Sequence, residues 1–328
     1  MSASPPDPVF VLRGASGPVT SLTFIVPPNG KNVQKLAAGT QNGYILIWDL
    51  QTKCLLQEWS ASDGEGSTIQ WLYNETPQQL WTQVRYEGVK MWDMNESPPV
   101  VMAEFSLDGY LGFGQSDVVS VNDWTKLLGI PGPGQEGVSV WDVEKRYKIC
   151  SLLPADPKSR GSLMQTRWVD VAGQVSLVVV YESGHLSLWD WKTSTITGEC
   201  QVGENPICFT YHNTKRLGVV GTTSEKVYIV TISDDLAIST IQEITITNPG
   251  LSCCVVRPDG KLYVTAGWDS RIRIFSSKKH KPIAVLQYHK KTVECLAYSV
   301  GDVEHLSTGC LLAAGSSDKS VSLWNIFN

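Results

Sequence analysis

The sequence contains no apolar run that could cross a membrane. Its longest candidate, residues 175–181, is far shorter than the roughly 18–20 residues that a membrane-spanning helix needs. The first eight residues lack both a basic segment and an apolar core, so no secretory signal is expected. These absences predict a cytoplasmic and nuclear protein that does not bind a membrane.

A basic excess is also missing. Among 328 residues, 27 Lys and Arg are balanced by 32 Asp and Glu, which gives a formal net charge of −5. Proteins dedicated to nucleic acids usually carry a basic face that pairs with phosphates, and this sequence shows no basic stripe. We therefore expect protein partners and no nucleic acid.

Motifs for catalysis and metal binding are absent as well. The eight cysteines form no C-x-x-C pair, and the five histidines lie in five segments without the spacing of metal ligands. There is no phosphate-binding loop, no G-x-S-x-G nucleophile motif and no H-E-x-x-H motif. We therefore expect no enzyme activity, no cofactor and no metal site.

Tryptophan, in contrast, is abundant, with 12 Trp against 7 Phe. Short alternating apolar runs end in a Trp-Asp pair at residues 48–49, 92–93, 141–142 and 189–190, and weaker copies end at Val230, Phe275 and Trp324. The six intervals between residues 48 and 324 average 46 residues. A period of about 40–45 residues with a recurring Trp-Asp pair is typical of four-stranded propeller blades.

The repeat resembles the WD-repeat family over nearly the whole chain. Seven copies predict an all-β, seven-bladed WD-repeat β-propeller that forms a single domain over residues 1–328, with residues 1–8 as a flexible tail. In the last copy, strands are expected at residues 293–298, 311–314 and 321–324, and no fourth strand follows. Residues 9–12 can supply that strand, which would close the ring and leave no unpaired edge.

Family resemblance also implies an internal brace. In WD repeats, an Asp in the turn before the third strand commonly bonds a His ahead of the first strand. The last copy carries both, as His289 and Asp318 with Trp324 beneath them, and the sixth carries Asp269 with Phe275 replacing the Trp. These residues are expected to be structural, and blades without the pair are expected to rely on packing alone.

Candidate binding residues lie on the loops, which a rigid scaffold holds in place. Trp268 lies beside a turn, and Arg271 and Arg273 place two cations on one side of the following strand. Trp, Tyr and Arg dominate interface hot spots. The predicted protein-binding set is Trp268, Arg271, Arg273, Asn248, Tyr86 and Lys290, with Tyr86 at the position equivalent to Trp268. The alternative is that Trp268 packs on the neighbouring blade and Arg271 pairs with a carboxylate.

A narrower resemblance lies in residues 7–14, 248–251, 257–261 and 265–273. They closely resemble the guanine nucleotide-binding protein beta-subunit-like protein 1 group, which is similar to the fungal ASTRA-associated protein 1. The resemblance implies a non-catalytic adaptor, monomeric outside its complex. It also implies that the protein works with the triple-T cochaperone complex, which matures phosphatidylinositol-3-kinase-related kinases for DNA-damage signalling.

Two other hypotheses stay open. One is a propeller that reads peptides or modified residues, for which Tyr86 and Trp268 are the candidate aromatics. The other is a signalling scaffold like a G-protein beta subunit. True beta subunits carry a long N-terminal helix that pairs with gamma, whereas only about eight residues precede the first expected strand here. We therefore expect no gamma-binding arm.

Overall fold

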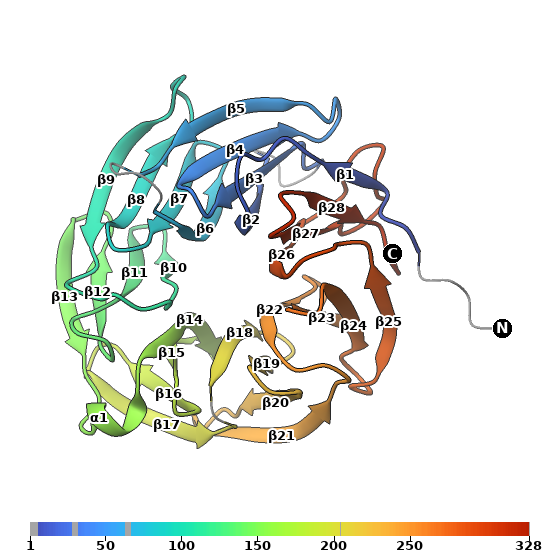
Figure 1. Cartoon of the computed structure of the whole chain (residues 1–328). Coiled ribbons are helices and arrows are strands. Elements are labelled where there is room, and N and C mark those ends of the chain that lie inside the picture. The colour runs from blue at the N-terminus through green and yellow to red at the C-terminus, as the bar shows by residue number, and fades with distance from the viewer. Residues whose placement is uncertain (1–5, 28–31, 63–66, 204, 328) are drawn as a thin grey trace. The chain divides into compact units, whose positions relative to one another are not determined.

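A computed structural model describes residues 6–27, 32–62, 67–203 and 205–327. The chain divides into two compact units: unit 1 comprises Met1–Phe105 and Ser252–Asn328, and unit 2 comprises Ser106–Leu251. The described part contains seven four-stranded sheets, termed blades here and numbered along the chain (Figure 1). Residues 1–5 of the expected N-terminal tail lie outside the described residues.

Blades 1, 2 and 6 of unit 1 keep their strands in chain order. Blade 1 contains β2 (Val19–Ile25), β3 (Lys35–Thr40), β4 (Tyr44–Asp49) and β5 (Leu55–Ser60). Blade 2 contains β6 (Ile69–Thr76), β7 (Gln79–Val84), β8 (Gly88–Asp93) and β9 (Val100–Ser106). Blade 6 contains β22 (Leu251–Val256), β23 (Leu262–Gly267), β24 (Arg271–Ser276) and β25 (Pro282–Gln287).

Blade 7 of unit 1 is built from both ends of the sequence. It contains β26 (Val293–Tyr298), β27 (Leu312–Ser316) and β28 (Val321–Trp324), with β1 (Phe10–Leu12) as its outer strand. β1 runs antiparallel to β28, with Phe10 opposite Leu323 and Leu12 opposite Val321 (Figure 1). The prediction that the N-terminal segment completes the last blade is confirmed.

Unit 2 contains blades 3, 4 and 5. Blade 3 contains β10 (Asp117–Asn122), β11 (Thr125–Pro131), β12 (Val138–Asp142) and β13 (Tyr147–Leu152). Blade 4 contains β14 (Leu163–Val171), β15 (Gln174–Tyr181), β16 (His185–Asp190) and β17 (Thr195–Gln201). Blade 5 contains β18 (Pro206–His212), β19 (Leu217–Thr222), β20 (Lys226–Ile232) and β21 (Ile238–Thr245). One short helix, α1 (Pro157–Arg160), precedes β14, and no helix among the described residues is long and apolar enough to cross a membrane.

Within each unit, the apolar core lies on the inner and middle strands and is shared between adjacent blades. Successive strand residues point to opposite faces. In β4, Leu46 and Trp48 belong to the apolar cluster shared with blade 7, whereas Ile45 and Ile47 belong to the cluster shared with blade 2. Outer strands are different, and β5 buries only one of its six residues. The repeated apolar run is therefore the middle strand of a blade.

Candidate functional site

Trp268 lies in the tight turn between β23 and β24. The turn is closed by a hydrogen bond from the Ser270 backbone N–H to the Gly267 carbonyl (3.1 Å). The Arg271 backbone N–H donates to the Asp269 carboxylate (3.2 Å), which fixes the end of the turn. Trp268 remains 51% exposed. An indole held in water by an ordered turn is available to a partner, and a partner that covers it gains its apolar surface.

Arg273 does not belong to the exposed surface, so its place in the predicted protein-binding set is wrong. It is 4% exposed, and its Nη2 lies 2.5 Å from Oδ2 of Asp269. A guanidinium this deeply buried requires a paired carboxylate, and Asp269 supplies it. Arg271, two residues earlier on the same side of β24, is half-buried, and the described residues give its side chain no ion pair. The carboxylate near Trp268 therefore pairs with Arg273.

Tyr86 is exposed, at 56%, but it does not occupy the position equivalent to Trp268. The turn of blade 2 is closed by a hydrogen bond from Glu87 N–H to Val84 C=O (3.2 Å). This register places Arg85 in the position of Trp268 and Tyr86 in the position of Asp269. The predicted equivalence was offset by one residue, because blade 2 has no Asp to mark the turn. The Arg85 guanidinium lies 4.6 Å from the Tyr86 ring centroid.

The remaining predicted binding residues fall in different places. Lys290 is exposed in the segment that leads into β26, and its backbone N–H donates to the Asp318 carboxylate (3.2 Å). Asn248 is half-buried in unit 2, after β21. The structure thus brings Trp268 and Arg271 together in one turn and holds Lys290 and Tyr86 in the same unit.

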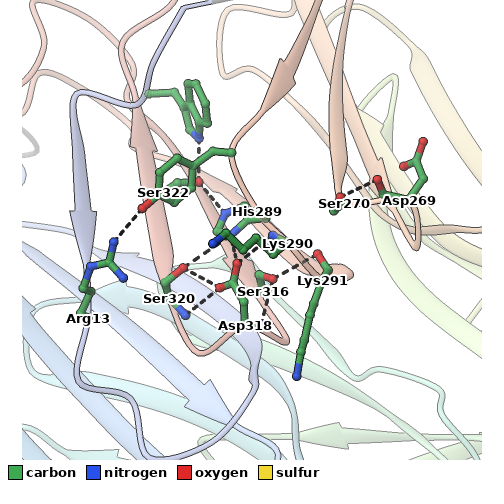
Figure 2. Close-up of polar contacts among 12 residues, drawn as sticks. Arg13, Asp269, Ser270, His289, Lys290, Lys291, Ser316, Asp318, Ser320 and Ser322 are labelled. Atoms are coloured by element: carbon green, nitrogen blue, oxygen red, sulfur yellow. Dashed lines mark hydrogen bonds and ion pairs between the residues drawn. The ribbon is translucent and has the colours of Figure 1, made fainter.

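A chain of hydrogen bonds crosses blade 7 from its turn to its core (Figure 2). His289 Nδ1 lies 2.9 Å from Asp318 Oδ2, and its Nε2 lies 2.7 Å from Ser322 Oγ. Trp324 Nε1 donates to the same Ser322 oxygen at 2.7 Å. Ser322 joins the two halves of this brace. Sequence reasoning missed it, although a Ser interrupting an apolar strand is a usable signal.

The brace is closed at the turn by Asp318. Burial alone would raise the pKa of this carboxyl, but hydrogen bonds from Ser320 and His289, with the attraction of His289, hold it below its ordinary value of 3.8. The Ser320 hydroxyl donates to Oδ1 at 2.5 Å. An ionised Asp318 that accepts several hydrogen bonds therefore locks the turn between β27 and β28.

Other blades also contain polar braces, so the expectation that they rely on packing alone is wrong. In blade 2, the buried Lys90 Nζ donates to the Ala61 carbonyl (3.1 Å) and lies 3.7 Å from Glu87 and 3.5 Å from Glu104. In blade 4, the Ser187 hydroxyl donates to Glu199, which is ion-paired with Arg160 of α1. Different residue types thus fill the place of the His-Asp pair.

The described residues hold no group of three or more His, Cys, Asp or Glu side chains that could bind a metal ion. The turns of unit 1 present an exposed indole, an exposed phenol and several cations to solvent.

Comparison with known proteins defines the family. The chain is 30% identical to guanine nucleotide-binding protein subunit beta-like protein 1 of Mus musculus, across 98% of this chain and 97% of the mouse protein. The chain belongs to this family. It is also 28% identical to ASTRA-associated protein 1 of Schizosaccharomyces japonicus, across 98% of this chain and 99% of the yeast protein. The "WD domain, G-beta repeat" model matches residues 6–49, 241–276 and 280–325.

A solved structure defines the fold class. The β-propeller domain of Cps50 (Swd1) from Myceliophteria thermophila covers 98% of this chain, and this chain covers 99% of it, with a TM-score of 0.78 at 14% sequence identity. The chain is therefore a seven-bladed WD-repeat β-propeller, the scaffold architecture that the repeat predicts.

Proposed function

We propose that this protein is a non-catalytic adaptor that works with the triple-T cochaperone complex in the maturation of phosphatidylinositol-3-kinase-related kinases, in the cytoplasm and nucleus. Two lines support the proposal. The relative from S. japonicus is named for its association with ASTRA. A propeller presents its loops on ordered strands, which suits a protein that positions partners.

The observation that carries the proposal is the half-exposed indole of Trp268 in an ordered turn beside Arg271. Aromatic residues and Arg at such positions supply most of the binding free energy of protein interfaces. We take this turn as the contact for the triple-T partner.

The experiment compares three tagged full-length proteins purified from cells and analysed by mass spectrometry: wild type, the Trp268→Ala/Arg271→Glu variant and the Trp124→Ala variant. Trp124 is a matched control because it is 83% exposed in the hairpin between β10 and β11, in unit 2. We expect wild type and Trp124→Ala to recover triple-T components, and the double variant to recover at least about tenfold less.

If the double variant recovers triple-T components as well as the wild type does, the adaptor function is retained and the Trp268 turn is excluded as its contact. Absence of triple-T components from the wild-type sample would overturn the proposed function. Thermal unfolding of each variant checks that the turn substitutions leave the fold intact, as surface changes usually do.

A further inference from the structure

Four cations gather where three chain segments meet at the turn end of blade 7. They are Arg13 from the segment after β1, Lys290 and Lys291 from the segment before β26, and Lys319 from the turn between β27 and β28. All four are exposed. We term them the blade 7 cation cluster.

Hydrogen bonds tie these segments to one another. The Arg13 guanidinium donates to the Tyr288 hydroxyl (2.9 Å), and the Lys319 ammonium donates to the Ser16 carbonyl (3.0 Å). The Ser316 hydroxyl donates to the Lys291 carbonyl (3.3 Å) (Figure 2). The cluster is therefore assembled by the closure of blade 7.

The carboxylates of the turns beside the cluster are already engaged. Asp318 accepts hydrogen bonds from His289 and Ser320, and Asp269 is paired with Arg273. Among the described residues, no side-chain carboxylate lies within ion-pair distance of the four cations of the cluster. The acids that border it, Glu58 and Glu294, accept hydrogen bonds from serine hydroxyls. The blade 7 cation cluster is therefore a local surplus of positive charge in a chain whose net charge is −5.

The cluster continues toward blade 6. Arg271 of β24 lies opposite Gln287 of β25, and the chain runs from Gln287 directly into the segment that carries Lys290 and Lys291. Figure 2 shows Lys291 with its ammonium group extended away from the hydrogen-bonded brace. Arg271, which follows the Trp268 turn, is therefore linked through Gln287 to the connection that carries Lys290 and Lys291.

We propose that the blade 7 cation cluster binds an acidic segment of the partner, rich in Asp and Glu, with Trp268 as the neighbouring apolar contact. This inference rests on the proposed function and specifies the chemistry of its partner. The argument is charge complementarity: four exposed cations on braced segments attract a carboxylate-rich peptide without having to release internal ion pairs first. Such a surface favours fast association that weakens as salt rises.

The test measures fluorescence anisotropy of a short dye-labelled peptide in which Glu and Asp flank a central Leu-Phe pair, titrated with the full-length protein. The same peptide with Gln and Asn replacing the acids is the neutral probe. We expect the acidic peptide to bind more tightly than the neutral one. We expect Lys290→Glu/Lys291→Glu to weaken its binding about tenfold, since two attractive charges become repulsive.

The matched control is Lys278→Glu/Lys279→Glu, which makes the same change of charge on two exposed lysines in the turn between β24 and β25. If this control weakens binding equally, the effect is one of net charge and the cluster is not a site. Equal binding of both peptides to the wild type would also overturn the inference. Binding that requires a phosphorylated version of the peptide would replace the carboxylate segment with a phosphopeptide and overturn it too.

Recovery of triple-T components by the same variants separates this inference from the proposed function. A loss of recovery by Lys290→Glu/Lys291→Glu, with the Lys278→Glu/Lys279→Glu control intact, supports both. Full recovery by both lysine variants leaves the adaptor standing and overturns the role of the cluster in it.

Discussion

At the scale of single residues, one position of the third strand explains how five of the seven blades are braced. It lies two residues before the aromatic that ends the apolar run, and it is occupied by Lys90, Ser139, Ser187, Arg273 and Ser322, all of them buried. A buried polar group costs free energy unless it is hydrogen bonded, so each requires a partner near the turn. The partner is an acid in blades 2 and 6 and a histidine in blade 7.

Asp318 provides a prediction of pH dependence at this scale. Its pKa is lowered in the folded state, so the unfolded chain binds the proton more tightly. The ionised carboxylate therefore stabilises the fold at pH values above 3.8, the ordinary pKa of the carboxyl. This stabilisation is lost as the pH falls through the lower pKa of the folded state. We expect Asp318→Asn to lower the free energy of unfolding by about 1–2 kcal/mol at neutral pH.

Urea unfolding of wild type and Asp318→Asn at a series of pH values checks this. The difference in the free energy of unfolding between the two proteins should shrink as the pH is lowered below 3.8. Asp123→Asn, an exposed Asp in the hairpin between β10 and β11, should match the wild type at every pH. A difference for Asp318→Asn that persists unchanged into acid would contradict the ionised brace.

At the scale of elements, the three residues of β1 determine whether blade 7 is complete. Leu12 is 1% exposed and shares its apolar cluster with Val19 of blade 1 and Leu323 of β28. Phe10 and Leu12 lie opposite Leu323 and Val321, so the strand both pairs with the blade edge and contributes to its core. Without β1, β28 would be an unpaired edge.

We expect Leu12→Ala to lower the free energy of unfolding by about 2–4 kcal/mol, because it removes buried methyl groups and leaves a cavity. Amide hydrogen exchange should accelerate first in β28, which loses the support of its outer strand. The control is Val9→Ala, at an exposed residue just before β1. Exchange in β28 that is unchanged in Leu12→Ala would show that β1 does not stabilise the blade.

At the scale of the whole molecule, the prediction of a single domain means that all seven blades should unfold cooperatively. A repeat of this type cannot bury its apolar face alone and depends on its neighbours. In unit 1, the two faces of β4 illustrate this, since Trp48 packs toward blade 7 and Ile47 toward blade 2. We extend the same dependence to the complete chain.

Calorimetry should therefore show one unfolding transition. Leu12→Ala in unit 1 and Leu188→Ala in unit 2 change buried residues of different units, and each should shift that single transition to lower temperature. Two resolved transitions, each sensitive to one of the variants, would mean that the units unfold independently and that the chain is two domains.

The strands could be predicted from the sequence more completely than the site. Strands expected at residues 293–298 and 321–324 coincide with β26 and β28, because alternating apolar residues and turn residues are local signals. The predicted turn of blade 2 is wrong by one residue, because Tyr86 occupies the position of Asp269 and not that of Trp268. Turn register is set by hydrogen bonds, which residue types report only indirectly.

By itself, the sequence determined the repeat, the number of blades and the strand that completes the last one, since these follow from patterns along the chain. Only the tertiary structure decided which cations are available. Arg271 and Arg273 lie on the same side of one strand, yet Arg273 is buried against Asp269 and Arg271 is not. His289 and Lys290 are neighbours, yet one lies inside the brace and the other in solvent. The physical reason is that burial depends on what another segment places opposite a side chain, and that segment can come from the far end of the chain, as the residues around Arg13 and Lys319 do.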